Sequence, residues 1–222
     1  MATKSFHQLL GAFLTVLVLQ SFVVKSRPVK SESPGQGSHG GRPTSDASFH
    51  SDVNNTLLSE RWNTFPVTYG FKSSSSMPAY LDPQAVATAI DTAFRKWQAT
   101  VPKFAFRKIY PGEDANIKIG FTPLHGYTGY GYSPPDGRLY LDNSHTNWST
   151  KSYPAGYEQD LMSVSMNAIG HTLGLGDSTN PTAVMYPTLY DGSIKRELSE
   201  EDMNRIQILY YYTPHLELGE PM

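Results

Sequence analysis

The pattern of apolar positions divides the chain into a segment without periodicity and a segment with clear periodicity. Between residues 27 and 55 the sequence is Ser, Gly, Pro, Lys and His with almost no apolar residue, which predicts disorder. From residue 56 to residue 212, apolar residues recur with the periods of strands and helices. We therefore expect one domain at 56–212, followed by a short tail at 213–222.

The periodic segment predicts one helix among strands and two helices after them. The first helix should begin at Asp82, an N-cap followed by Pro83, and the last at Ser199, where Ser199 and Asp202 have the spacing of a capping box. A further helix is expected at about 157–173, and strands at 67–71, 104–109, 115–121, 129–133 and 137–142. This order of elements indicates the α+β class.

One core should unite the apolar stripes of these elements. Its expected members are Phe71, Ile90, Phe94, Trp97, Ile117, Ile119, Leu139, Leu141, Leu161, Ile169, Leu173, Ile206 and Leu209.

The N-terminal residues have the pattern of a secretory signal peptide. Lys4 precedes an apolar run at 9–24 that is short for a membrane span, and small or apolar residues follow before Arg27. We expect a signal peptide at 1–26 and a secreted, extracellular protein; the alternative is an uncleaved anchor. The sequons at Asn54 and Asn147 are candidate glycosylation sites.

Composition excludes several kinds of chemistry. The chain has 18 basic and 20 acidic residues, a balance that argues against nucleic acid or, once the signal is cleaved, a membrane surface as the main partner. It has no cysteine, which excludes disulfides, thiolate nucleophiles and Cys-ligated metals.

Several motifs in order then resemble one family. The stretches "ANIKIGF", "SPPDGRLYLD", "GHTLGLG", "AVMYPTL" and "ELSEEDMNRIQILY" are similar to those of the matrixins (matrix metalloproteinases), across 57–212. The plant branch is the most similar, and in overall appearance its legume nodulin-like members. The resemblance implies a metzincin-type α+β catalytic-domain fold, a twisted mixed sheet with three helices, an extended peptide cleft, and a Met-turn at Met185 beneath a metal.

The metal motif of that family is only partly present. It reads His-Glu-x-x-His-x-x-Gly-x-x-His, in which three His bind zinc and the Glu is the general base. The corresponding residues here are Asn167, Ala168, His171, Gly174 and Asp177. Ala168 has no basic group, so no catalytic residue is intact. His171 and Asp177 remain as residual metal ligands, with Asn167 at the first ligand position. We therefore expect no cofactor, with weak residual Zn²⁺ at His171 and Asp177 as the alternative.

A second metal region that the resemblance implies is also altered. The loop after "IGF" is short and keeps His125 as a candidate ligand, whereas the next two His positions correspond to Tyr130 and Tyr140. Asp142 matches a calcium position without its Glu companion, which leaves Ca²⁺ binding open. The family's propeptide Cys is also missing, so we expect a degenerate member that lacks the propeptide and folds without zinc.

The peptide-binding parts of the cleft remain. In the family, substrate lies antiparallel to an edge strand, which here contains Gly129, Tyr130 and Gly131, and a pocket is walled by Tyr186 and Pro187. The tyrosines of this region either form a recognition surface or replace the structural zinc by packing, and for Tyr140 we favour packing.

Three functions follow as hypotheses. The leading one is a secreted pseudoprotease that binds an extended peptide or extracellular protein segment without cleaving it. The second is a zinc metalloendopeptidase of reduced or altered activity, and the third is a structural protein of the extracellular matrix that uses another surface.

Overall fold

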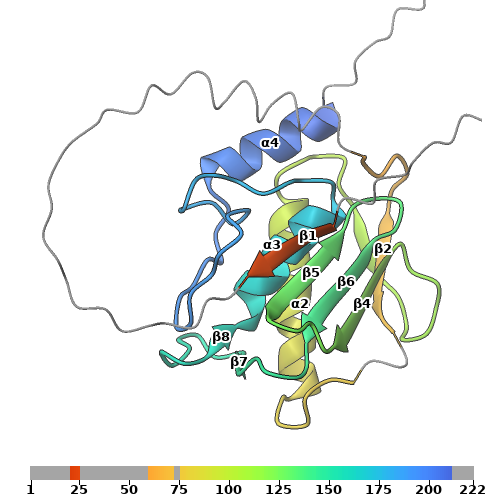
Figure 1. Cartoon of the computed structure of the whole chain (residues 1–222). Coiled ribbons are helices and arrows are strands. Elements are labelled where there is room, and N and C mark those ends of the chain that lie inside the picture. Colours follow the sequence, from red (N-terminus) through yellow and green to blue (C-terminus); the bar gives the residue numbers. More distant parts are fainter. Residues whose placement is uncertain (1–20, 26–59, 73–75, 212–222) are drawn as a thin grey trace, which may run out of the picture.

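A computed structural model describes residues 21–25, 60–72 and 76–211 (Figure 1). It contains a six-stranded sheet with the strand order β1-β5-β6-β4-β2-β3 and a separate two-stranded pair, β7 and β8. The strands are β1 (Ser21–Lys25), β2 (Val67–Phe71), β3 (Phe106–Lys108), β4 (Ile117–Thr122), β5 (Tyr127–Tyr132), β6 (Arg138–Asp142), β7 (Trp148–Ser149) and β8 (Gln159–Asp160). The helices are α2 (Pro83–Gln98), α3 (Leu161–Thr172) and α4 (Glu200–Tyr211).

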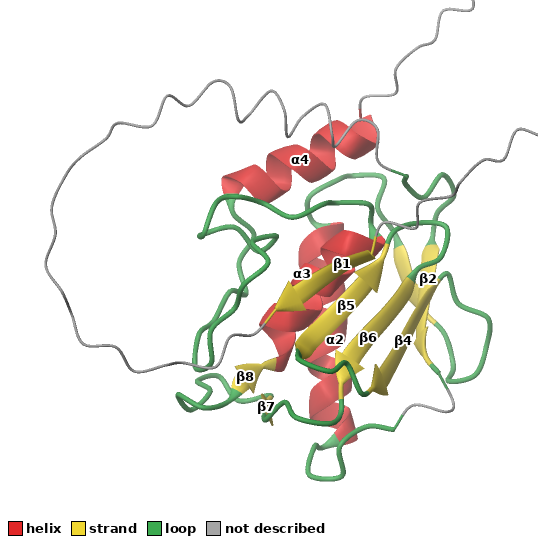
Figure 2. Cartoon of the chain, viewed as in Figure 1, coloured by secondary structure: helices red, strands yellow, loops and turns green. Residues whose placement is uncertain are grey.

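The main sheet is mixed, as expected. Strands β3, β2, β4 and β6 run parallel to their neighbours, while β5 is antiparallel to β6 and β1 is antiparallel to β5. Helices α2 and α3 pack against each other behind the sheet, and α4 lies at one end of the molecule (Figure 2). The expected α+β fold with three helices is confirmed.

The predicted core is confirmed almost residue by residue. Of the thirteen expected members, all are buried except Phe71, which is partly buried and packs against the same cluster. The cluster joins the sheet, α2 and α3 to the inner face of α4.

Both predicted helix starts are confirmed by their hydrogen bonds. The Asp82 carboxylate accepts from the backbone N–H groups of Gln84 and Ala85 at the start of α2. At the start of α4, the carboxylate of Asp202 accepts from the N–H and hydroxyl of Ser199, and the Ser199 hydroxyl accepts from the Asp202 N–H. The reciprocal pair is the capping box that the spacing predicted.

Two features were not predicted. Strands β7 and β8 have two residues each, too short for a periodic signal. The segment Ser21–Lys25, within the expected signal peptide, forms β1 against β5. The remainder of the signal peptide, the expected disordered segment with Asn54, and the tail at 213–222 lie outside the described residues. Within the described ranges, no helix has the length and apolar character needed to cross a membrane.

Candidate functional site

Helix α3 places three of the expected metal-site positions in the interior. Asn167 and His171 are one turn apart and are buried, as is Ala168 between them. The Asn167 side-chain nitrogen Nδ2 donates to the carbonyl of Val184 at 2.8 Å. This position is therefore used to hold the turn that follows α3, and Ala168 presents only a methyl group.

His171 is held as a neutral imidazole. Its Nδ1 lies 2.8 Å from the Leu175 carbonyl, which can only accept, so Nδ1 carries the proton. Burial lowers the pKa of His171 to about 4, although the hydrogen bond to Leu175 opposes this shift. The other ring nitrogen, Nε2, lies 3.4 Å from Oδ1 of Asp177. At neutral pH the imidazole is uncharged and its lone pair is on Nε2.

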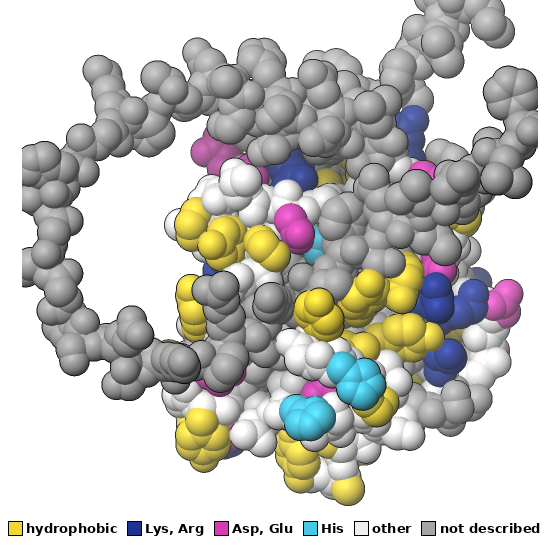
Figure 3. All heavy atoms as spheres, in the orientation of Figure 1, with side chains coloured by type: hydrophobic (Ala, Val, Ile, Leu, Met, Phe, Trp, Pro, Cys, Tyr) yellow, Lys and Arg dark blue, Asp and Glu magenta, His cyan; other side chains and the backbone are white. Residues whose placement is uncertain are grey.

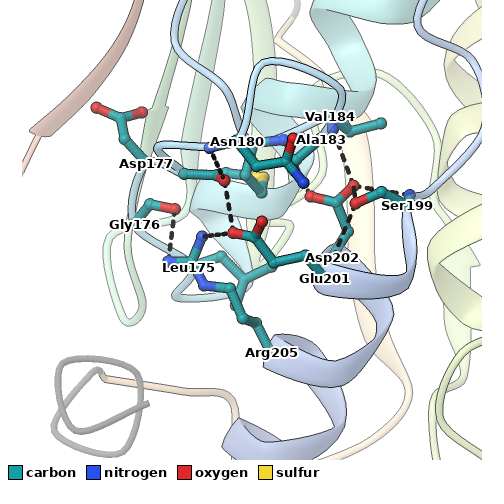
Figure 4. A network of polar contacts seen from close by, with 12 residues as sticks. Leu175, Gly176, Asp177, Asn180, Ala183, Val184, Ser199, Glu201, Asp202 and Arg205 are labelled. Atoms are coloured by element: carbon teal, nitrogen blue, oxygen red, sulfur yellow. Dashed lines mark hydrogen bonds and ion pairs between the residues drawn. The ribbon is translucent and has the colours of Figure 1, made fainter. Parts of the chain in front are cut away.

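Asp177 is delivered to His171 by the turn that ends α3. Gly174 follows the helix with a φ of 99°, a left-handed conformation that glycine adopts without strain. The next residues are fixed to α4, because Arg205 Nη2 donates to the Gly176 carbonyl at 3.0 Å. Figure 4 shows the Asp177 side chain directed away from this network. Partial burial raises the pKa of Asp177 to about 6, and Arg205 opposes the shift.

These residues do not fit a catalytic zinc ion. Within residues 21–25, 60–72 and 76–211, no three His, Cys, Asp or Glu side chains are close enough together to hold a metal. Catalytic zinc normally takes three protein ligands and a water. The site has one imidazole nitrogen, one carboxylate and the neutral amide oxygen of Asn167, which is not a usual zinc ligand, whereas the Asn167 nitrogen that faces Val184 is a donor without a lone pair to offer.

Met185 is part of the core rather than support for a metal. It is fully buried, and a Cβ built on Gly170 of α3 would lie 2.3 Å from its sulfur atom. The backbone N–H groups of Val184 and Met185 donate to the buried carboxylate of Asp202 at 2.8 and 3.1 Å (Figure 4). The turn around Met185 therefore joins α3 to α4, and the Met185 side chain fills space in the core between them.

The glycines of β5 allow the strand to approach α3. A Cβ on Gly129 would lie 2.6 Å from Cγ1 of Val164, and a Cβ on Gly131 would lie 2.3 Å from the carbonyl oxygen of Ala168. The nearby backbone belongs to the helix.

The outer edge of β5 pairs with a segment of the same chain. Strand β1 runs antiparallel to β5, with Ser21 opposite Tyr132 and Lys25 opposite Tyr127 in register. This is the edge that the sequence analysis assigned to an extended peptide. The two residues assigned to the pocket wall, Tyr186 and Pro187, are half-buried, and Lys195 Nζ lies 4.8 Å from the centre of the Tyr186 ring.

Tyrosines pack where the resemblance implies a structural zinc. Tyr130 and Tyr140 lie opposite each other on β5 and β6. The ring centres of Tyr130 and Tyr132 are 4.8 Å apart, and those of Tyr132 and Tyr140 are 6.5 Å apart. Arg138 lies 4.1 Å from the centre of the Tyr132 ring. Figure 3 shows hydrophobic side chains gathered over β5 and β6, bordered by Lys and Arg. For Tyr140, the sequence favoured such packing over a role in a recognition surface.

The carboxylate at the expected calcium position is surrounded by hydrogen-bond donors of the chain itself. Asp142 is buried and accepts six hydrogen bonds, from the backbone of Leu124, Ser144, His145 and Thr146 and from the hydroxyls of Ser144 and Thr146. Burial opposes its ionisation, but these bonds outweigh it and hold the pKa of Asp142 well below its usual range. His125, the other remaining candidate ligand, is exposed at a φ of 47°.

A pocket of about 190 Å³ at the start of β5 was not anticipated. Residues from β5, the loop after β6, β8 and the chain beyond the Met185 turn contribute to it, among them Gln159 and Asp191. No local motif marks these residues, because segments far apart in sequence form the pocket. The sequon residue Asn147 is exposed and also borders it.

Comparisons with a family model and with individual proteins give one consistent result. The sequence model described as Matrixin matches residues 61–211. Metalloendoproteinase 1-MMP of Arabidopsis thaliana is 33% identical over 172 residues, covering 71% of this chain and 46% of that protein. Metalloendoproteinase 1 of Glycine max is 32% identical over 188 residues, covering 77% of this chain and 57% of that protein. Karilysin of Tannerella forsythia is 32% identical over 177 residues, covering 72% of this chain and 35% of that protein. The chain spans about half the length of the plant relatives it matches.

Proposed function

Because this chain belongs to the matrixin family, we propose that it is a secreted pseudoprotease that binds an extended peptide or extracellular protein segment without cleaving it. The observation that carries the proposal is the residue set on α3, where Ala168 occupies the position of the general base and Asn167 that of the first ligand. A positioned general base contributes a factor of about 10²–10⁴ to the rate. Without it and without a full ligand set, the family's reaction has no machinery in this site.

The binding half of the proposal is supported by the edge of β5. A sheet edge offers N–H and C=O groups to which an extended chain can add as a further strand. Here a segment of the chain itself, Ser21–Lys25, is paired antiparallel along that edge. A partner of the same extended form would make the same backbone hydrogen bonds if β1 were removed or displaced.

Secretion is part of the same proposal. The expected signal peptide at 1–26 would deliver the domain to the apoplast or cell wall in a plant, where a protein segment would be the partner. From the family resemblance alone, we propose plant cell-wall or nodule-infection remodelling as the process. We propose no cofactor, no nucleic-acid partner and, after signal cleavage, no membrane partner.

A binding and cleavage assay on one peptide array tests the proposal. We expect the secreted protein to retain a subset of peptides and to leave them intact by mass spectrometry. Tyr130→Lys, on β5, should weaken this binding, whereas the control Tyr153→Lys, at a side chain with 84% exposure, should not. Equal binding by both variants would reject the β5 edge as the site. Cleavage of bound peptides by the unmodified protein would reject the pseudoprotease.

The second hypothesis, an endopeptidase of altered activity, is favoured by one observation. His171 Nε2 and Asp177 Oδ1 remain 3.4 Å apart. Peptidase activity that is abolished by His171→Ala would establish it. The third hypothesis, a structural matrix protein with another working surface, predicts partner binding that neither Tyr130→Lys nor Tyr186→Lys changes.

A further inference from the structure

The pocket at the start of β5 has the lining of a site for a positively charged group. Of the described residues that line it, two are the carboxylates Asp142 and Asp191, two are the tyrosines Tyr127 and Tyr157, and none is Lys or Arg. Its volume of about 190 Å³ corresponds to roughly six water molecules at about 30 Å³ each. Carboxylates and aromatic faces both attract a cation.

One residue that lines this pocket, Gln159, has a buried side-chain oxygen for which the described part of the chain supplies no hydrogen-bond donor. Gln159 is 2% exposed, and its Nε2 donates to the Leu189 carbonyl and to Oδ1 of Asp191. Both partners can only accept, which fixes the orientation of the amide. Its other atom, Oε1, has no donor among the described residues. A buried acceptor without a donor is destabilising, so a ligand that supplies an N–H group would relieve this cost.

The pocket also lies where an antiparallel chain along β5 would pass. Tyr127 and Thr128, the first two residues of β5, line it. In the pairing of β1 with β5, the residue opposite Tyr127 is Lys25, which follows the apolar residues Phe22, Val23 and Val24. The chain's own extended segment therefore has a basic residue at the register position that borders the pocket.

We propose that this pocket binds the Lys or Arg side chain of an extended peptide that lies antiparallel along β5. The ammonium or guanidinium group would donate to Oε1 of Gln159 and lie beside the carboxylate of Asp191. This inference rests on the proposed function and adds to it a preference for a peptide with an apolar stretch followed by a basic residue.

Calcium is the competing occupant, and the hydrogen bonding of Asp142 disfavours it. Calcium takes six to eight oxygen ligands, usually including several carboxylate oxygens. Both oxygens of Asp142 already accept hydrogen bonds, six in all. A side chain that brings its own N–H donors needs fewer free oxygens than a metal ion does.

Three fluorescent peptides test the proposal on the naturally processed protein secreted by a eukaryotic host. The first has the sequence Ser-Phe-Val-Val-Lys-Ser, and in the others norleucine or Glu replaces the Lys. We expect the norleucine peptide to bind roughly tenfold more weakly, or worse, because it loses charge-assisted hydrogen bonds. Asp191→Asn should weaken the Lys peptide only. The control Asp114→Asn, at a side chain with 92% exposure, should change nothing.

The outcomes separate this inference from the function on which it rests. Equal affinity for the Lys and norleucine peptides would overturn the inference and leave peptide binding in place. Binding of none of the three at millimolar concentration would overturn both. A rise in melting temperature with calcium that Asp191→Asn abolishes would show a metal site, and this also overturns the inference.

Discussion

Single residues show how hydrogen bonds from the chain itself satisfy acidic and polar groups in the interior of this domain. Asp142 is buried as a carboxylate because six donors of the chain surround it. Hydrogen bonds to a charged group contribute more than those between neutral groups, and a buried charge without them is strongly unfavourable. The conformation of the loop after β6 therefore depends on the ionised side chain of Asp142.

Replacing Asp142 by Asn should destabilise the protein in a pH-dependent way. At pH 7 we expect Asp142→Asn to lower the free energy of unfolding by about 2–3 kcal/mol. The NH₂ group of the Asn side chain would face N–H and O–H donors of the loop, where a carboxylate oxygen now accepts their hydrogen bonds. The pKa of Asp142 is held below its usual range by these hydrogen bonds. The stabilisation is thus fully present above the unfolded pKa of about 3.9 and is lost as the pH falls through the lower folded value. Urea unfolding of the variant and the unmodified protein at pH 7 and at pH 3 measures the loss of stability and its dependence on pH.

Asp114→Asn is the control for this series, since that side chain is 92% exposed. It should leave the unfolding free energy within about 0.5 kcal/mol of the unmodified protein. A deficit in Asp142→Asn that does not shrink in acid would show that the lost contacts, and not the charge, account for the effect.

The zinc site should be restorable, because its backbone is in place. Asn167 and His171 are one turn apart on α3, and the turn after Gly174 brings Asp177 to His171. We expect the triple variant Asn167→His, Ala168→Glu, Asp177→His to bind zinc and to cleave peptides detectably. Base and ligands act as a unit, so no single change should suffice. A folded triple variant without zinc in elemental analysis would contradict the assigned positions.

Among the secondary-structure elements, β5 and α3 pack closely against each other at the glycines of β5. The glycines of β5 leave no room for a side chain on the helix-facing side, and β5 in turn carries β1 on its outer edge. The position of the edge relative to His171 therefore depends on two residues without side chains.

A methyl group on Gly131 should separate these elements. Its Cβ would lie 2.3 Å from the Ala168 carbonyl oxygen and 2.8 Å from Cβ of His171, and neither can move without moving α3. We expect Gly131→Ala to cost about 1–3 kcal/mol of stability, measured by urea unfolding. Gly156→Ala is the matched control, because a Cβ there meets nothing within 4 Å. Equal stability of the two variants would mean that β5 and α3 pack less closely than described.

Local sequence signals predicted most elements and failed for pairings between distant segments. The stripe of Ile90, Phe94 and Trp97 and the capping box of Ser199 and Asp202 depend on neighbours within four residues, so they could be predicted. Strand β1 pairs with residues about a hundred positions away, and the pocket at Gln159 combines several distant segments. The loss of the zinc motif was visible because its spacing is local, whereas the reason for the glycines of β5 required the position of α3.

At the scale of the whole molecule, the core connects the sheet to the helices and tyrosines pack together on β5 and β6, which supports the proposal that the domain folds without a bound metal. The core cluster joins the sheet to all three described helices. Tyr132 and Tyr140, with Arg138 and Lys72 against their rings, cover the outer face of β5 and β6. The domain should therefore be stable without a bound ion.

A chelator should leave the melting temperature unchanged. A bound metal stabilises a protein by mass action, so its removal lowers the melting temperature. We expect scans in EDTA and in buffer to coincide within about 1 °C, since a shift of several degrees corresponds to about 1 kcal/mol. A fall of many degrees that zinc or calcium reverses would show a structural metal that the described residues do not account for.

The most direct test of the central claim, that this matrixin domain has lost its catalytic zinc, is the zinc content of the purified secreted protein. The protein is equilibrated with micromolar zinc, desalted, and measured by elemental mass spectrometry beside His171→Ala. We predict far less than one zinc per chain, and the same value for both proteins. One zinc per chain in the unmodified protein, lost in His171→Ala, would contradict the account.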